Sequence, residues 1–185
     1  MKKILNMAMV LCLLASLLLM TSCENALAES SVHKNEKVSA LDFTINTKMG
    51  VRYGERCAMF TYQNNSAYKL TDFTLTLKPK DNLTETEIEE LYALIQKEYR
   101  ASDSEMEMVK QYGIDVLSIE MWCYDDVLAG AESESEEIEG PFGDLESLDQ
   151  LNYFEEDILE FTYVDENGDT NTVYYDYINK TYTHD

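Results

Sequence analysis

CAMFTYQNNSAYKLTDFTLTLK, residues 57–78, is the stretch that most directly indicates the fold of this chain. It begins with an apolar run, and the polar triplet at 64–66 supplies residue types that favour a turn. After the triplet, Phe73, Leu75 and Leu77 alternate with polar residues, and this period of two predicts a half-buried strand. We therefore expect two strands joined as a hairpin by a short polar turn.

Strand patterns also lie on both sides of this stretch. Before it, apolar and polar residues alternate over 41–45. After it, strand character returns at 115–124, 157–165 and 170–178, and the Asn-Gly pair at 167–168 is a strong hairpin signal between the last two. Helices are not interleaved with these strands, which predicts antiparallel pairing and argues against a parallel α/β sheet.

A helical segment interrupts the strands. Capping boxes begin at Thr84 and Ser102, each with a glutamate three residues later. Apolar residues recur behind the first box at helical spacing: Ile88, Leu91, Tyr92, Ile95 and Tyr99. We expect an amphipathic helix over 84–100 and a shorter one over about 103–112, ended by Gly113.

These patterns predict a mainly β fold, an antiparallel two-sheet sandwich with an inserted α-helical segment near 84–112. The stretch 57–78, with the Gly-Ala-Glu-Ser sequence at 130–133, resembles small immunoglobulin-like domains of bacterial cell-surface lipoproteins. The resemblance implies an immunoglobulin-like β-sandwich over residues 38–185 and a location at the cell surface. It implies no activity.

The first residues have the layout of a secretory signal. Lys2 and Lys3 precede an almost unbroken apolar run over 4–20, and small and polar residues follow it. The Met-Thr-Ser-Cys sequence that ends at Cys23 resembles the bacterial lipobox. That resemblance implies a diacylglyceryl group on the Cys23 sulfur and a mature chain that begins there. Residues 1–22 are then a signal peptide.

The polar residues 23–37 form the expected flexible tether between lipid and domain. Acyl chains on Cys23 would give a stable membrane anchor. Two alternatives remain open: the apolar run could stay as a transmembrane helix, or cleavage at the Ala-Leu-Ala at 26–28 could release a soluble protein. We expect a lipid-anchored protein on the extracytoplasmic side of the cell membrane.

The chain is strongly acidic, with a net charge of −22. Between Lys110 and Lys180 there are 20 acidic residues and no lysine or arginine. This charge argues against nucleic acid as a partner and permits a cationic protein or an envelope polymer. We expect an acidic loop over 125–149, and its low-complexity glutamates are the contact candidates: Glu132, Glu134, Glu136, Glu137 and Glu139.

Two cysteines, Cys57 and Cys123, belong to the expected domain. An even pair in an oxidising compartment predicts a disulfide. Two buried free thiols are the alternative, and the strand patterns do not decide between them.

Candidates for catalysis are missing from the sequence. Its histidines are His33 in the tether and His184 next to the C-terminus, so neither is well placed for a nucleophilic pair or a zinc site. No glycine-rich phosphate loop appears, and the carboxylates are too numerous for any pair to stand out. We expect no enzyme activity, no metal site and no cofactor.

Two functions fit these observations. The first is a protein-interaction or binding module of the cell envelope, held at the membrane through Cys23. The second is a lipoprotein that binds a small molecule, a glycan or a cation. An exposed apolar patch or sheet edge would favour the first function, and a pocket lined by tyrosines would favour the second.

Overall fold

The computed structural model describes residues 37–184. The expected signal peptide, Cys23 and the tether up to residue 36 lie outside them. The strands are β1 (Phe43–Arg52), β2 (Glu55–Asn64), β3 (Lys69–Pro79), β4 (Ile119–Cys123), β5 (Glu136–Gly140), β6 (Gly143–Asp144), β7 (Phe154–Val164), β8 (Thr170–Asp176) and β9 (Thr181–His184). The helices are α2 (Glu85–Tyr99) and α3 (Asp103–Tyr112), with short 3₁₀ turns η1 (Ala40–Asp42), η2 (Ile114–Val116) and η3 (Asp149–Tyr153).

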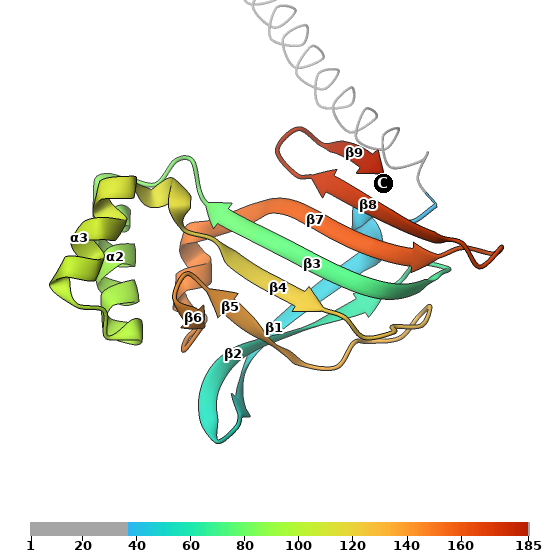
Figure 1. The fold of residues 1–185 in the computed structure, drawn as a ribbon, viewed down its shortest axis with the longest axis horizontal. Coiled ribbons are helices and arrows are strands. Elements are labelled where there is room, and N and C mark those ends of the chain that lie inside the picture. Colours follow the sequence, from blue (N-terminus) through green and yellow to red (C-terminus); the bar gives the residue numbers. More distant parts are fainter. Residues whose placement is uncertain (1–36, 185) are drawn as a thin grey trace, which may run out of the picture. The chain divides into compact units, whose positions relative to one another are not determined.

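The prediction of a mainly β, antiparallel fold with a helical insertion is confirmed, but the immunoglobulin-like sandwich is not. The strands form one open sheet in the order β1-β2-β5-β4-β3-β7-β8-β9, with β6 paired to β5 (Figure 1). The short strand β5 joins the two halves, because it pairs with β2 on one side and with β4 on the other. A shared strand makes one continuous sheet where two separate sheets were expected.

The predicted hairpin over 57–78 is wrong, although both of its strands exist. β2 pairs with β1 and β5, whereas β3 pairs with β4 and β7. The buried side chain of Asn64 explains the corner between β2 and β3. Its amide donates to the carbonyl oxygens of Tyr68 and Val127 at 2.9 and 3.0 Å. These hydrogen bonds hold the turn against residues 127–128. β3, which follows the turn, therefore begins in a different part of the sheet from β2.

β2 pairs with β1 in a hairpin whose turn is Tyr53-Gly54, with φ of 53° and 89°. Two consecutive residues with positive φ are typical of tight hairpin turns whose twist matches that of the paired strands.

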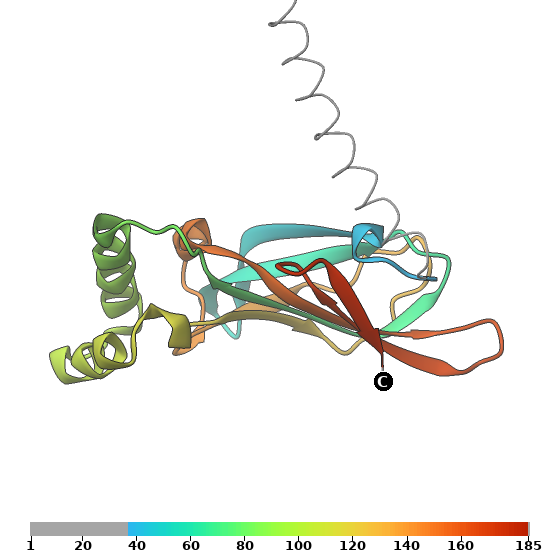
Figure 2. The same ribbon diagram turned by 90° about the horizontal axis from the view of Figure 1, so that it is seen from above.

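The sheet curls so that β1 and β2 lie across from β3 and β7 (Figure 2). Aromatic side chains fill the space between these layers. The rings of Tyr62 and Phe73 stack with centroids 4.2 Å apart, and those of Phe43 and Phe161 lie 5.0 Å apart. Such pairs bury large apolar areas and add about 0.5–1.5 kcal/mol beyond that burial. The aromatic contacts between the β1–β2 part and the β3–β7 part of the sheet therefore form a core like the one between the two sheets of a sandwich.

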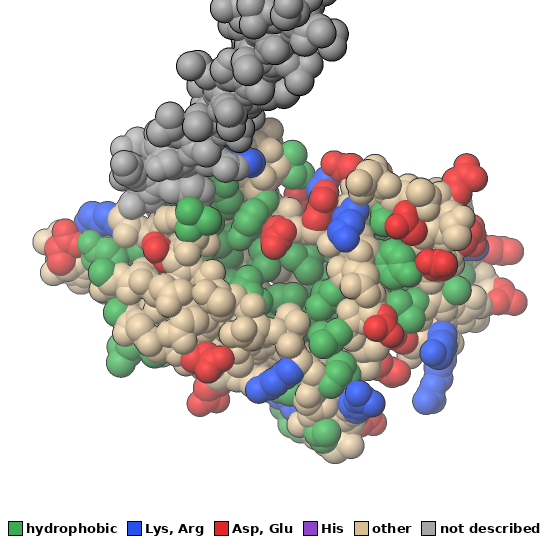
Figure 3. Space-filling model, turned by 180° about the vertical axis from the view of Figure 1, so that it is seen from behind, with side chains coloured by type: hydrophobic (Ala, Val, Ile, Leu, Met, Phe, Trp, Pro, Cys, Tyr) green, Lys and Arg blue, Asp and Glu red, His purple; other side chains and the backbone are tan. Residues whose placement is uncertain are grey.

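The face opposite to the view of Figure 1 shows hydrophobic side chains gathered along its middle (Figure 3). A small hollow of about 260 Å³ opens between β1 and the strands across from it, and Ile45, Leu75 and Met121 contribute to its lining. The curled sheet thus leaves its core partly open on the β1 side.

Both predicted helices are confirmed. Each begins at its capping box, in which Thr84 and Ser102 accept a hydrogen bond from the backbone of the glutamate three residues later. The apolar face of α2 buries Leu91 and Ile95 completely. In Figure 1 the two helices lie at one end of the sheet, and neither covers a face. Within residues 37–184 no helix is both long and apolar enough to cross a membrane.

The sequence patterns predict some of the later strands correctly and others only in part. The β7–β8 hairpin is confirmed, with Gly168 at φ 86° in its turn. β4 is shorter than the predicted 115–124, because η2 takes the first residues.

The predicted acidic loop is partly wrong, since β5 lies inside it. The side chain of Ile138 is completely buried between acidic neighbours on the strand. A single apolar residue among glutamates gives no period-two signal. The expectation of an acidic loop therefore fails at β5, the strand that joins the two halves of the sheet.

Replacing Ile138 with alanine should lower the free energy of unfolding by about 2–5 kcal/mol, because it empties a fully buried site. Ile178 offers a matched control: it loses the same atoms but is 53% exposed, so Ile178→Ala should cost no more than about 0.5 kcal/mol. Urea unfolding of the two variants measures both values. Equal costs would show that β5 is not a central strand.

Candidate functional site

The turn between β5 and β6 lies at the helical end of the sheet and separates two concave surfaces. Phe142 in this turn lines both of them and remains 45% exposed. Its ring contacts Tyr99 near the end of α2, with centroids 5.7 Å apart. The two concavities are called here the apolar groove and the arginine cleft.

The apolar groove lies between α3, η2 and the β5–β6 turn and has a volume of about 330 Å³. Its lining residues are Glu105, Met108, Val109, Tyr112, Val116, Leu117, Pro141 and Phe142.

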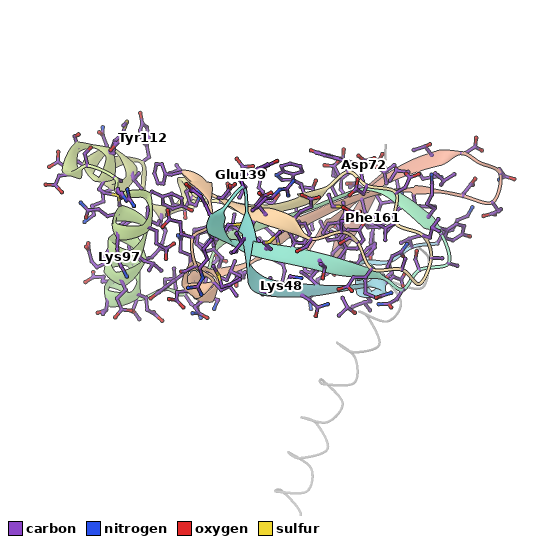
Figure 4. The ribbon with its side chains drawn as sticks, turned by 90° about the horizontal axis from the view of Figure 1, so that it is seen from below. Lys48, Asp72, Lys97, Tyr112, Glu139 and Phe161 are labelled. Carbon is purple, nitrogen blue, oxygen red and sulfur yellow. The ribbon has the colours of Figure 1, made fainter. Side chains whose placement is uncertain are left out.

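Helical geometry explains how α3 forms one wall of this groove. Met106 and Val109 are buried, which fixes the inner face of the helix. Met108 and Tyr112, four residues apart, are neighbours on the surface and are 53% and 68% exposed. Figure 4 labels Tyr112 in the helical region, at one end of the sheet. Val116, 56% exposed, extends this apolar surface beyond the helix.

No basic side chain lines the groove within the described part of the chain, and its charged lining residue is Glu105. The one lysine of α3, Lys110, is engaged elsewhere. Its Nζ lies 3.2 Å from a carboxylate oxygen of Glu89 and 5.2 Å from the centre of the Tyr92 ring. Asp103 and Glu107 are exposed on the same helix. Both are two residues from Glu105 and therefore point to another side of α3, so Glu105 is the acid at the groove itself.

The five glutamates proposed from the sequence do not form one free loop. Glu136 and Glu137 both lie 2.5 Å from the Arg52 guanidinium and are half-buried. Hydrogen bonds occupy two others: Glu132 accepts from the Thr61 hydroxyl at 2.6 Å, and Glu139 accepts from the Trp122 indole at 3.2 Å.

Neutralising all five together, as a test of an acidic contact, would also remove the partners of Arg52. Glu134 is exposed and has no side-chain partner among the described residues. Of the five proposed glutamates, Glu134 is the one that matches the prediction of a free acidic loop.

The arginine cleft, on the other side of Phe142, has a volume of about 530 Å³. It lies between the β1–β2 turn, the end of α2 and the β5–β6 turn. The Tyr99 hydroxyl donates to the Gly143 carbonyl at 3.3 Å, and burial raises the pKa of Tyr99 to about 12. In the same wall, the buried carboxylate of Glu98 accepts from Ser147 at 2.5 Å and from Gln150 at 2.6 Å. These bonds give the α2 side of the cleft a fixed shape.

Cys57 and Cys123 are both buried, and their thiols are free in the structure. Desolvation is the main cause that raises the pKa of each thiol, and nearby carboxylates add to it. The thiolate is the reactive form, so a raised pKa disfavours reaction at both cysteines. The described histidine, His184, lies in the terminal strand β9.

Within residues 37–184, no three His, Cys, Asp or Glu side chains are grouped so that they could hold a metal ion. No protein-family model matches this chain, and no curated protein or solved structure shows significant similarity to it.

The state of the two thiols can be measured directly. Iodoacetamide at mildly alkaline pH should leave Cys57 and Cys123 unmodified in the folded protein, because burial and a raised pKa suppress the thiolate. Both should be alkylated once urea unfolds the chain without a reductant. Peptide mass mapping distinguishes the outcomes, since cysteines that need a reductant before labelling would be joined in a disulfide.

Proposed function

We propose that this chain is a non-catalytic binding module of the cell envelope that contacts another protein through the apolar groove. In this proposal a lipid on Cys23 holds the domain at the extracytoplasmic face of the membrane. The observation that carries the contact is the group of exposed apolar side chains at one end of the sheet: Met108, Tyr112, Val116 and Phe142.

An open apolar surface of this kind favours a macromolecular partner over a small ligand. Leaving large apolar side chains in water costs about 25 cal/mol for each Å² that could be buried. Contiguous exposed apolar surface therefore commonly marks an interaction site. Met108 supports this role in particular, because an unbranched side chain can repack against different partners.

The charge around the groove defines the partner's chemistry. Glu105 lines the groove, and no lysine or arginine lines it among the described residues. A complementary partner presents an apolar row for the groove and lysine or arginine on its flanks. An amphipathic helix with a basic polar face has this pattern, and binding in a groove is a common way to recognise one.

Site-specific crosslinking tests this contact. A photo-crosslinking amino acid in place of Met108 or Tyr112 should join the protein to a partner in intact cells. A synthetic amphipathic helix of leucine and lysine should compete with that product, because it supplies the expected apolar row and basic flank. A helix of the same length built from leucine and glutamate should not.

Leu128 and Ile178 are matched control positions, 63% and 53% exposed but outside the groove. The same product from these positions, or competition by both peptides alike, would contradict the proposed contact. The variant Glu105→Gln should slow association with the leucine–lysine helix without unfolding the domain, because glutamine can keep the capping box. High salt should have the same effect, since the Debye length falls from about 10 Å at 0.1 M to about 3 Å at 1 M.

The lipid anchor has its own test. Replacing Cys23 with alanine should move the protein from the membrane fraction to the soluble fraction, because it removes the sulfur that would carry the acyl chains. Mass spectrometry of the wild-type N-terminal peptide should find the lipid on Cys23. An unmodified mature N-terminus at Glu29 would instead indicate cleavage after the Ala-Leu-Ala sequence.

A further inference from the structure

The whole sequence contains three arginines, Arg52, Arg56 and Arg100, and all three line the arginine cleft. They come from different elements: Arg52 ends β1, Arg56 lies near the start of β2, and Arg100 follows α2. In a chain of net charge −22, the fold brings every guanidinium to one concavity. Guanidinium groups are well suited to recognise carboxylates, because their planar fork can donate two parallel hydrogen bonds.

The arginines of the cleft differ in whether their guanidinium groups already have a partner within the protein. Arg52 is held by Glu136 and Glu137. The guanidinium groups of Arg56 and Arg100 make no hydrogen bond or ion pair with any residue between 37 and 184. Arg52 is therefore a structural member of the wall, and the other two are available to a ligand.

The same cleft also holds carboxylates without partners. Glu98 and Glu137 are engaged by Gln150 and Arg52. The three remaining acids of the lining form no side-chain hydrogen bond or ion pair among the described residues: Glu55, Asp144 and Glu146. The cleft thus presents separate positive and negative groups that do not neutralise each other.

Two residues of the cleft lining have left-handed backbone conformations. Three non-glycine residues of the described chain have positive φ, and two of them, Tyr53 at 53° and Arg100 at 52°, line the arginine cleft. Tyr53 lies in the β1–β2 turn and Arg100 caps the end of α2, two places where a left-handed conformation is common.

We propose that the arginine cleft binds a small zwitterion of amino-acid or dipeptide size, and that it does so through Arg56 and Arg100 on one side and the acids of β6 and its flank on the other. The ligand's carboxylate lies against the two guanidiniums, and its ammonium group against Asp144 and Glu146. Tyr53, Tyr99 and Phe142 supply apolar and aromatic surface for its side chain.

The net charge selects a zwitterion over a simple anion. The field of a strongly acidic protein repels a lone carboxylate or phosphate, whereas a ligand of zero net charge meets no such barrier. A volume of about 530 Å³ is within the usual range for small-molecule sites. Ligand binding was the second function that the sequence left open, and this form of it does not depend on the groove contact.

Calorimetric titration of the full chain in detergent micelles tests the proposal with defined probes. Phenylalanine or the dipeptide phenylalanylalanine should bind. N-acetylphenylalanine lacks the ammonium charge and phenylalanine amide lacks the carboxylate, so each should bind at least about tenfold more weakly than phenylalanine. Inorganic phosphate should not compete.

Variants then identify the two ends of the site. Arg56→Gln and Arg100→Gln should each weaken phenylalanine binding by roughly tenfold. Lys97→Gln removes the same charge from α2 outside the cleft and should change nothing. The double variant Asp144→Asn, Glu146→Gln should weaken phenylalanine but strengthen N-acetylphenylalanine, an opposite pair of effects that loss of folding cannot produce.

The results that overturn the proposal are equally specific. If neither zwitterion binds, no such site exists. If N-acetylphenylalanine binds as well as phenylalanine, the cleft is a plain carboxylate site. If Lys97→Gln matches the arginine variants, only the overall charge matters. None of these results bears on the groove contact, because the crosslinking positions lie on the other side of Phe142.

Discussion

The pairing of β5 with two neighbours is the interaction on which the rest of the structure depends. β5 meets β2 through Met59↔Glu137 and β4 through Met121↔Ile138, so it is the strand that connects the β1–β2 hairpin to the larger part of the sheet. Because a strand must be extended to pair on both sides, the glutamates of β5 are fixed in place. They are then close enough to hold Arg52 from β1. The same strand ends in the turn that carries Phe142, so both concave surfaces take their position from it.

Local sequence signals were reliable wherever a local interaction forms the structure. The capping boxes at Thr84 and Ser102 involve residues three apart, and the hairpin at 167–168 closes on itself, so all three could be predicted. Pairing between distant strands could not. The Asn64 region contains ordinary turn residues, but its amide bonds to Val127, 63 residues away. β5 was missed for a related reason: burial of Ile138 depends on β2 and β4, which no pattern within 132–139 reveals.

The candidate sites, too, could be predicted only where local interactions form them. The amphipathic pattern of α3 identifies Met106 and Val109 as inner residues, but it does not show that the exposed Met108 and Tyr112 face Phe142 across a groove. The arginines could have been noticed from composition, since three in so acidic a chain are few. Because they are spread from residue 52 to residue 100, the sequence does not show that all three line one cleft. The acidic candidates were identified by residue type alone, and the structure divides them into ion-pair members, hydrogen-bond acceptors and Glu134.

Negative charge has different consequences at the two proposed sites. At the groove it adds to the apolar contact, because a basic flank on the partner is attracted over several ångströms before the apolar row is buried. At the cleft it opposes any ligand that carries only a carboxylate, so the arginines must be matched by an ammonium group that the acids can receive. Both proposals therefore place positive charge on the binding partner. In the groove that charge lies at the edge of an apolar contact, whereas in the cleft it accompanies a carboxylate held by Arg56 and Arg100. An acidic domain with its few guanidiniums gathered in one place can make this distinction, whereas a uniformly acidic surface would attract every cation alike.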